Sequence, residues 1–221
     1  MIHINKPVKL KLMPSVIFML SLVVCFMSSV SNADGAKSLD VFLQHKNNTL
    51  SANFVQTIYG KKKNKISNGS MQISRPNKFR WQYKEDEQLI VSDGKHIYIY
   101  DKPLQQVTQK KLDAVLGKSP ALLLAGGTDI KKHYNIKALP DTEDIEWVLL
   151  SPKDVKDNNG FKAVEMGFKK SDKTLRAMKF TDSFDNKSRI DFSSVKNGVS
   201  FSAAEFKFAP PAGVDMVKAD N

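Results

Sequence analysis

Hydrophobic and polar residues alternate most clearly in residues 75–83. Phe79 and Trp81 fall on one face of a predicted strand, because successive side chains of a strand point to opposite sides. Pro76 cannot donate a backbone hydrogen bond, so it belongs at the beginning of that strand. Counted at the same period of two, Arg75 shares the aromatic face. A permanently charged guanidinium beside an apolar wall needs a partner or a function.

The period of two recurs through most of the chain and predicts about eleven short strands between residues 51 and 208. Turn residues separate the strands, for example at Asp93-Gly94 and at Lys196-Asn197-Gly198. The last strand is expected at residues 199–208. After it, the sequence Pro210-Pro211-Ala212-Gly213 closes the domain and a polar tail follows.

Three short helices are predicted among the strands. Residues 36–50 carry an incomplete apolar stripe, with Ser38 as the candidate N-cap. Residues 112–117 form a single helical turn. The third helix begins at Ser119-Pro120, a cap followed by a proline at the first helical position, and continues through residues 121–125. A helix this short and apolar on every side must lie on an apolar concavity.

Together these elements favour a mainly β fold, in which one strongly curved antiparallel sheet carries a helical cover. Alternation in residues 96–101 places Tyr98 and Tyr100 on one face of the sheet and Ile97 and Ile99 on the other. Both faces of this part of the sheet are therefore partly apolar. We therefore expect something to cover each of them.

Residues 1–33 have the composition of a secretory signal peptide. Three lysines precede an apolar run, and Ser31-Asn32-Ala33 offers small residues at the positions that a signal peptidase reads. We expect cleavage after Ala33, which leaves residues 34–221 as a single domain exported to the periplasm. An uncleaved membrane anchor is the alternative, but the apolar run is shorter than the ~20 residues that a span needs.

Cleavage would lower the formal net charge from +11 to +8, because the segment holds three lysines and no acidic residue. An exported protein meets no nucleic acid. The excess of positive charge then suits binding to anionic lipid surfaces or to an acidic protein partner, or it serves no specific ligand. The run Lys61-Lys62-Lys63 is interpreted as a solvated hairpin tip, with a docking patch as the alternative.

No pattern in the sequence is typical of an enzyme or of a metal site. The single cysteine, Cys25, lies in the expected signal peptide, and the three histidines that follow it lack metal-type spacing. The acidic residues between 141 and 146 are interpreted as a solvated hairpin. We therefore predict no catalytic residue, no metal and no cofactor, and we expect the protein not to be an enzyme.

Several short motifs, in a fixed order, resemble the family of periplasmic outer-membrane lipoprotein carriers, LolA. The resemblance covers residues 36–216. The residues that carry it are Phe54-Val55-Gln56-Thr57, Arg75-Pro76-Asn77-Lys78-Phe79-Arg80-Trp81, Ile90-Val91-Ser92-Asp93-Gly94-Lys95, Tyr98-Ile99-Tyr100, Pro120-Ala121-Leu122-Leu123-Leu124, Tyr134-Asn135-Ile136 and Phe206-Lys207-Phe208-Ala209-Pro210-Pro211-Ala212-Gly213-Val214.

The resemblance implies an incomplete antiparallel β-barrel with a lid of helices over a hydrophobic cavity. It implies a monomeric carrier that receives lipoproteins from an inner-membrane lipoprotein-releasing ABC transporter. The acyl chains of the cargo would lie in the cavity and pass to an acceptor at the outer membrane.

The functional arginine of the family corresponds to Arg75, and the lid segment that it contacts corresponds to Leu124 and Ala125. Apolar strand and helix residues complete the predicted acyl-chain cavity, which consists of Phe79, Trp81, Leu89, Ile90, Val91, Tyr98, Leu122 and Leu123. Two departures from the family pattern affect the lid. Ala121 replaces a larger apolar residue, and Gly126-Gly127 loosens the end of the helix.

Arg75 is suited to act as a latch for this lid. The last carbonyls of a helix have no partner within the helix and carry partial negative charge. The five donors of a guanidinium are able to bond several of them. The alternative is an ordinary arginine at the beginning of a strand, facing solvent. Arg80 falls on the opposite face from the aromatic residues.

Two other functions are compatible with the same fold. One is a lipid-binding or lipid-modifying periplasmic protein on an open barrel, which would need titratable residues on the cavity-facing side. The other is a module that senses mislocalised lipoproteins. The lack of titratable residues on the cavity-facing side disfavours the first, which a buried His96 with a nearby carboxylate would favour again.

Overall fold

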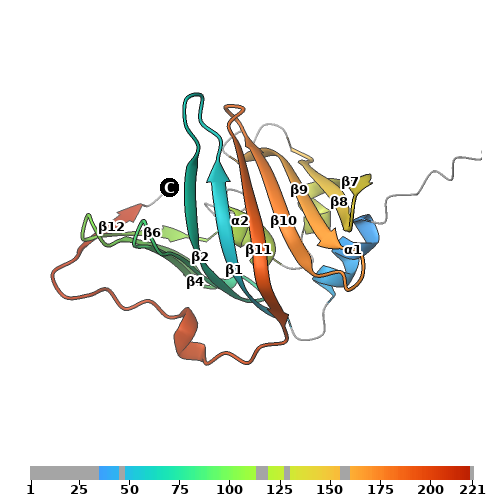
Figure 1. Ribbon diagram of the computed structural model, residues 1–221. Helices are drawn as coiled ribbons and strands as arrows, with labels where there is room; N and C mark the ends of the chain where they lie inside the picture. Colours follow the sequence, from blue (N-terminus) through green and yellow to red (C-terminus); the bar gives the residue numbers. More distant parts are fainter. Residues whose placement is uncertain (1–34, 45–47, 113–118, 127–129, 155–159, 220–221) are drawn as a thin grey trace, which may run out of the picture. The chain divides into compact units, whose positions relative to one another are not determined.

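One sheet of twelve strands accounts for most of the structure (Figure 1). The computed structural model describes residues 35–44, 48–112, 119–126, 130–154 and 160–219. The expected signal peptide, most of the helical turn at 112–117 and Gly127 lie outside these residues. The strands are β1 (Thr49–Ile58), β2 (Lys65–Ser74), β3 (Lys78–Tyr83), β4 (Gln88–Asp93), β5 (His96–Asp101), β6 (Gln106–Lys111), β7 (Tyr134–Thr142), β8 (Ile145–Pro152), β9 (Phe161–Lys169), β10 (Leu175–Asp182), β11 (Lys187–Asn197) and β12 (Asp215–Ala219).

The strands follow the order β12-β6-β5-β4-β3-β2-β1-β11-β10-β9-β8-β7. Neighbours are antiparallel except for β12, which pairs in parallel with β6. The sheet is open, because β12 and β7 form its two edges. The predicted fold class, a mainly β open barrel with helices, is confirmed, with one strand more than the sequence suggested.

The register between β2, β3 and β4 assigns residues to the two faces. Trp81 lies opposite Met71 on one side and Ile90 on the other, so these three side chains share a face. We call this the inner face and its reverse the outer face. Arg80 lies opposite Val91 on the outer face, away from the aromatic residues, as the alternation predicted.

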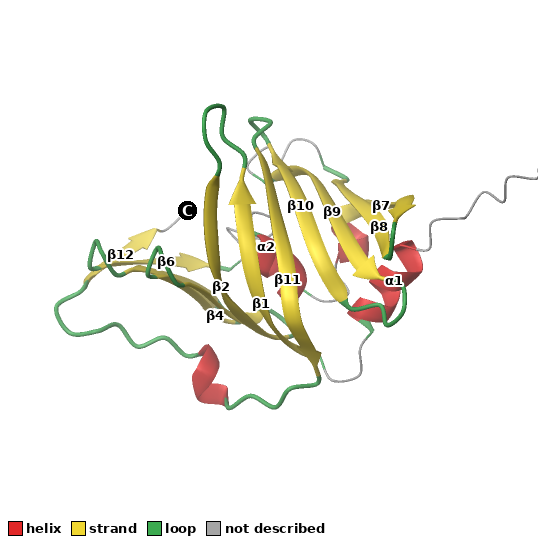
Figure 2. Ribbon diagram, in the orientation of Figure 1, coloured by secondary structure: helices red, strands yellow, loops and turns green. Residues whose placement is uncertain are grey.

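Among the described residues, three α-helices accompany the inner face: α1 (Gly35–Leu43), α2 (Pro120–Ala125) and α3 (Ile130–His133), which are among the helices drawn in red in Figure 2. α1 contacts β7, β8 and β9, whereas α2 contacts β2 and β3. Their apolar residues join those of the inner face in one continuous core, in which Leu39 of α1 and Leu124 of α2 are completely buried. No helix of the described residues has both the length and the apolarity needed to cross a membrane.

The first helix differs from its prediction at both ends. It begins at Gly35 and ends at Leu43, because the chain is already extended in β1 from Thr49 onward. Ser38 lies inside the helix and is not its N-cap. Gly35 is required by close packing, since a Cβ atom there would lie 2.1 Å from the carbonyl oxygen of Trp147.

Helix α2, predicted as the third helix, follows its prediction closely. The hydroxyl of Ser119 accepts a hydrogen bond from the backbone N–H of Leu122 at 3.5 Å, and Pro120 occupies the first helical position. Gly126 caps the other end, and its N–H donates to the carbonyl of Leu122 at 2.8 Å. All five residues that follow Pro120 are buried.

The strand expected at residues 199–208 does not form. Residues 198–214, which we call the C-terminal strap, instead run along the outer face of β3 and β4 and contain the short 3₁₀ helix η3 (Ala203–Phe206). Figure 2 shows the strap as a long connection between β11 and β12. Its alternating aromatic residues pack on the sheet rather than within it: Phe206 is buried, and the ring of Phe208 stacks on that of Tyr98 at 5.4 Å.

Candidate functional site

The side chain of Arg75 connects the C-terminal ends of two helices. Its Nε donates a hydrogen bond to the carbonyl oxygen of Leu124 in α2 at 2.8 Å. Its Nη1 donates to the carbonyl oxygen of Phe42 in α1 at 3.2 Å. Arg75 is only 8% exposed, so the interpretation as a solvent-facing arginine is wrong.

The turn between β2 and β3 positions this guanidinium. The backbone N–H of Arg75 donates to the carbonyl of Asn48 at 2.8 Å. Two residues later, the N–H of Asn77 donates to the carbonyl of Ala125, also at 2.8 Å. The hydroxyl of Ser92 donates to the carbonyl of Asn77 at 2.6 Å and ties the turn to β4. The turn therefore binds the end of α2 through its backbone as well as through Arg75.

The guanidinium lies in an apolar and weakly polar surrounding. Its Cζ is 4.3 Å from the centroid of the Phe42 ring, a cation–π geometry. Burial lowers the pKa of Arg75 to about 10, so the group remains charged at neutral pH. The Nη2 of Arg75 is buried without a hydrogen-bond partner among the described residues. The partial negative charge of two helix ends thus takes the place of a carboxylate counter-ion.

Aromatic side chains form the inner face beside this turn. Phe79 is completely buried and Trp81 is 2% exposed. The Trp81 ring lies 4.5 Å from the ring of Phe54 and 6.4 Å from that of Phe192, measured between centroids. Gly69 gives the Phe54 ring its space, because a Cβ at that position would lie 2.6 Å from the ring. The indole Nε1 of Trp81 has no hydrogen-bond partner among the described residues.

Helix α2 fills the space above these aromatic residues. Leu122, Leu123 and Leu124 are each at most 5% exposed and belong to the same core as Phe79 and Trp81. A hollow of about 400 Å³ lies instead on the outer face, where mostly polar side chains of β1, β2, β3 and β11 line it. That lining suits no acyl chain. On the inner face, the buried leucines of α2 cover the apolar surface, so the protein's own helix occupies it.

Three of the predicted cavity residues lie on the wrong face. Val91 pairs with Arg80 and with Tyr98, and Leu89 pairs with Gln82, so all of them belong to the outer face. The C-terminal strap covers this surface, which explains why it is apolar. Of the three predicted cavity residues in β4, only Ile90 points to the inner face and packs against the core.

Sequence reasoning missed two parts of the Arg75 contact. Phe42 was recognised only as part of the apolar stripe of its helix, and no pattern linked its carbonyl to an arginine 33 residues away. Asn77 has a positive φ of 66°, a conformation that asparagine adopts more readily than most residues. The asparagine directly after Arg75-Pro76 is the signal from which a tight turn at this place could have been predicted.

A buried polar contact holds α1 on the sheet. The hydroxyl of Ser38 donates to the carboxylate of Glu146 in β8, and the Nζ of Lys173 donates to the same carboxylate at 2.6 and 2.8 Å. Burial acts to raise the pKa of Glu146, but the hydrogen bonds from Lys173 and Ser38 outweigh it and lower that pKa below its ordinary value. The interpretation of Glu146 as part of a solvated hairpin is wrong.

Comparison with known proteins agrees with this architecture. Residues 45–209 match the family model described as outer membrane lipoprotein carrier protein LolA. A protein of Chromobacterium violaceum, named outer-membrane lipoprotein carrier protein, is 47% identical over 173 residues, which are 78% of this chain and 82% of the relative. A protein of the same name from Nitrosomonas europaea is 39% identical over 93% of this chain and 100% of its own length.

Among solved structures, an uncharacterized conserved protein from Thermus thermophilus is similar in fold, with a TM-score of 0.54 and 11% sequence identity. The match covers 83% of this chain and 98% of that one. At this identity the likeness concerns the fold alone. The family model and the curated relatives go further: the chain belongs to the LolA family of outer membrane lipoprotein carrier proteins.

Proposed function

We propose that this protein is a periplasmic lipoprotein carrier, a transport chaperone without catalytic activity. It receives lipoproteins from an inner-membrane lipoprotein-releasing ABC transporter and delivers them to an acceptor at the outer membrane. The names of its relatives supply the class of cargo. The observation that carries the proposal is the wholly apolar helix α2, which Arg75 holds on the aromatic inner face.

The cargo's acyl chains take the place of α2 on the inner face. Each methylene of an acyl chain gains about 0.8 kcal/mol on leaving water, so a lipid anchor does not cross an aqueous compartment unaided at a useful rate. Phe79, Trp81 and Ile90 supply an apolar surface of the kind that such chains need. Leu122 and Leu123 cover the same surface when no cargo is bound.

Arg75 acts as the latch of this exchange. Closure forms the bonds from Arg75 to Leu124 and Phe42 and the bond from Asn77 to Ala125, and opening breaks at least those that reach α2. Closure therefore competes with the cargo for the inner face. A competition of this kind lets the carrier release its cargo, because the empty state is stabilised by the same helix that the cargo displaces.

Export and processing complete the proposal. Residues 1–33 direct the chain to the periplasm and are removed after Ala33, and residues 34–221 act as one monomeric domain. The N-terminal residue of protein recovered from the periplasm, read by mass spectrometry, tests this part directly. A chain that still begins at Met1 would contradict it.

The carrier function is tested by the cargo that the protein holds. Protein expressed from its full gene is purified from the periplasm and analysed by mass spectrometry for acylated peptides. We expect triacylated N-terminal peptides of lipoproteins to co-purify. A preparation that carries a small modified lipid and no acylated peptide would overturn the proposal.

The role of Arg75 is tested by transfer of that cargo to acceptor membranes. Arg75→Leu should keep the fold and bind cargo, but release at least about tenfold less, because charge-assisted hydrogen bonds that favour closure are lost. Arg80→Leu, on the outer face, is the matched control and should transfer normally. Normal release by Arg75→Leu would contradict the latch.

A further inference from the structure

Two hairpin tips lie side by side at one end of the sheet, as Figure 1 shows. Residues 59–64 connect β1 to β2, and residues 183–186 connect β10 to β11. The backbone N–H of Tyr59 donates to the carbonyl of Lys187 at 3.0 Å, which joins the two hairpins just below their tips. We call residues 58–66 and 183–187 together the twin-tip surface.

Large apolar side chains are exposed on this surface. Phe184, in the turn of the second hairpin, is 83% exposed. Ile66 is 65% exposed and Tyr59 is 48% exposed, and both lie on the outer face of the first hairpin. Phenylalanine at a turn contributes nothing to the core when it is this exposed, and several such residues together mark an interaction surface.

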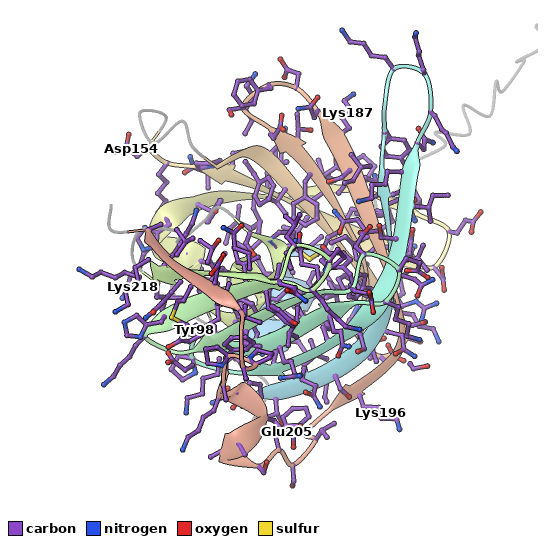
Figure 3. All side chains as sticks on the ribbon, turned by 90° about the vertical axis from the view of Figure 1, so that its left-hand side faces the viewer. Tyr98, Asp154, Lys187, Lys196, Glu205 and Lys218 are labelled. Atoms are coloured by element: carbon purple, nitrogen blue, oxygen red, sulfur yellow. The ribbon has the colours of Figure 1, made fainter. Side chains whose placement is uncertain are left out.

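Lysines surround these apolar side chains. Lys61, Lys62 and Lys63 occupy the first tip and Lys187 flanks the second, and none of the four side chains has a partner among the described residues. Figure 3 shows Lys187 at the same end of the sheet as the first tip and far from Glu205 of the strap.

The acidic residues of the second tip are already engaged. Asp182 accepts hydrogen bonds from the backbone of Phe184 and Asn186 within the turn. Asp185 pairs with Lys162 at 2.9 Å. The charges of Asp185 and Lys162 cancel each other. Asp182 keeps its negative charge, but one carboxylate against four lysines leaves the surface positive.

We propose that the twin-tip surface binds the surface of an anionic phospholipid membrane. Exposed aromatic and aliphatic side chains enter the boundary between headgroups and acyl chains, while neighbouring lysines bind the anionic headgroups. Phe184 projects from a turn, and Ile66 and Tyr59 lie beside the neighbouring tip. A narrow projecting end is suited to entering a bilayer surface and poorly suited to the extensive complementary contact of a protein interface.

The surface is separate from the Arg75 contact. β2 joins Lys65, at the tip, to Ser74, beside Arg75, and a strand of ten residues is about 30 Å long. Binding at the tips therefore leaves α2 free to move. The proposal does not rest on the carrier function, since a vesicle test needs no cargo.

Vesicle binding of protein purified from the periplasm tests the proposal. We expect binding to phosphatidylglycerol–phosphatidylethanolamine vesicles that weakens at high salt, and weak binding to phosphatidylcholine vesicles. A triple variant with Lys61→Glu, Lys62→Glu and Lys63→Glu should bind anionic vesicles at least about tenfold more weakly. A control with Lys95→Glu, Lys207→Glu and Lys218→Glu has the same net charge and should bind nearly as the parent does.

Insertion of the apolar tip is measured separately. In the variant Phe184→Trp, brominated lipids in anionic vesicles should quench the fluorescence of the new indole. Leu104 lies in a turn outside the twin-tip surface and is 69% exposed. The indole of the control variant Leu104→Trp should therefore not be quenched. Equal binding of the two lysine variants, or no quenching of Phe184→Trp, would overturn the proposal. Binding to poly-glutamate but not to vesicles would also overturn it and identify an acidic protein as the partner.

Discussion

Arg75 binds Phe42 in two ways at once: its Nη1 donates to the Phe42 carbonyl at 3.2 Å, and its Cζ lies 4.3 Å from the centroid of the Phe42 ring. The same guanidinium reaches Leu124 through Nε. One side chain thus fixes α1 and α2 to the turn between β2 and β3. A change at position 75 therefore affects both helices, and α2 more strongly, because α1 has its own anchor at Ser38.

Replacing Arg75 with lysine should loosen α2 without unfolding the sheet. An ammonium group is a point charge and lacks the planar fork that reaches two carbonyls while lying on a ring. We expect hydrogen exchange of the Gly126 amide, which donates to Leu122, to become about tenfold faster in Arg75→Lys and faster still in Arg75→Leu.

Amides of β10 and β11 serve as the internal reference in that experiment, since they pair within the sheet far from the turn. Uniformly faster exchange in α2 and in these strands would indicate global destabilisation. Unchanged exchange at Gly126 would show that Arg75 does not hold the helix.

The two faces of β4 and β5 should contribute differently to cargo binding. Ile90→Ala removes an apolar group from the inner face and should weaken cargo retention several-fold, since each buried methylene contributes about 0.8 kcal/mol. Tyr98→Ala, on the outer face, should loosen the stacked Phe208 and leave retention unchanged. Retention of acylated cargo after gel filtration measures both. Equal losses would place the cargo outside the inner face.

Alternation predicted which residues share a face but not what covers each face. Phe79 and Trp81 were grouped correctly because a period of two is a local property of an extended chain. Val91 and Tyr98 were assigned to the cavity because they are apolar, although the same alternation separates Val91 from Ile90. The strap that covers them comes from residues more than a hundred positions later, and its aromatic spacing resembled that of a strand.

Local sequence patterns also did not predict polar contacts between residues that are far apart in the sequence. A serine near a predicted helix start is a common N-cap. Ser38 instead lies inside the helix and bonds to Glu146, 108 residues away. By contrast, the cap at Ser119-Pro120 was predicted correctly, since every group that forms it lies within four residues. Local patterns thus predicted structure that depends on neighbouring residues, and they missed contacts between residues that are far apart in the sequence.

Gly69 should tolerate no side chain. A Cβ there would lie 2.0 Å from the Gln82 carbonyl oxygen and 2.6 Å from the Phe54 ring, so Gly69→Ala must displace both the strand pairing and the aromatic cluster. We expect a loss of about 2–3 kcal/mol in the free energy of unfolding, typical of overpacking in a core. Urea denaturation measures it, with Ser70→Ala on the outer face as the control. A loss below that of the control would contradict the close contact.

Glu146 should make stability depend on pH in the acid range. Its folded-state pKa is lowered, so the unfolded chain binds a proton more readily than the folded one. The stabilisation is therefore fully present above the ordinary value of 4.5 and is lost as the pH falls below it toward the folded-state value. Glu146→Gln should cost about 1–3 kcal/mol at neutral pH, because hydrogen bonds to a charged group are lost.

Urea denaturation of parent and variant across this pH range checks the prediction. The difference in the free energy of unfolding between parent and variant should shrink as the pH falls. Protonation of Glu146 removes from the parent the same negative charge that the substitution removes from the variant. Glu165→Gln is the control: Glu165 pairs with Lys179 at 2.8 Å, but both side chains are at least one-third exposed, so its loss should cost less than about 1 kcal/mol. A difference between parent and Glu146→Gln that stays constant with pH would show that the carboxylate charge does not hold α1 to β8.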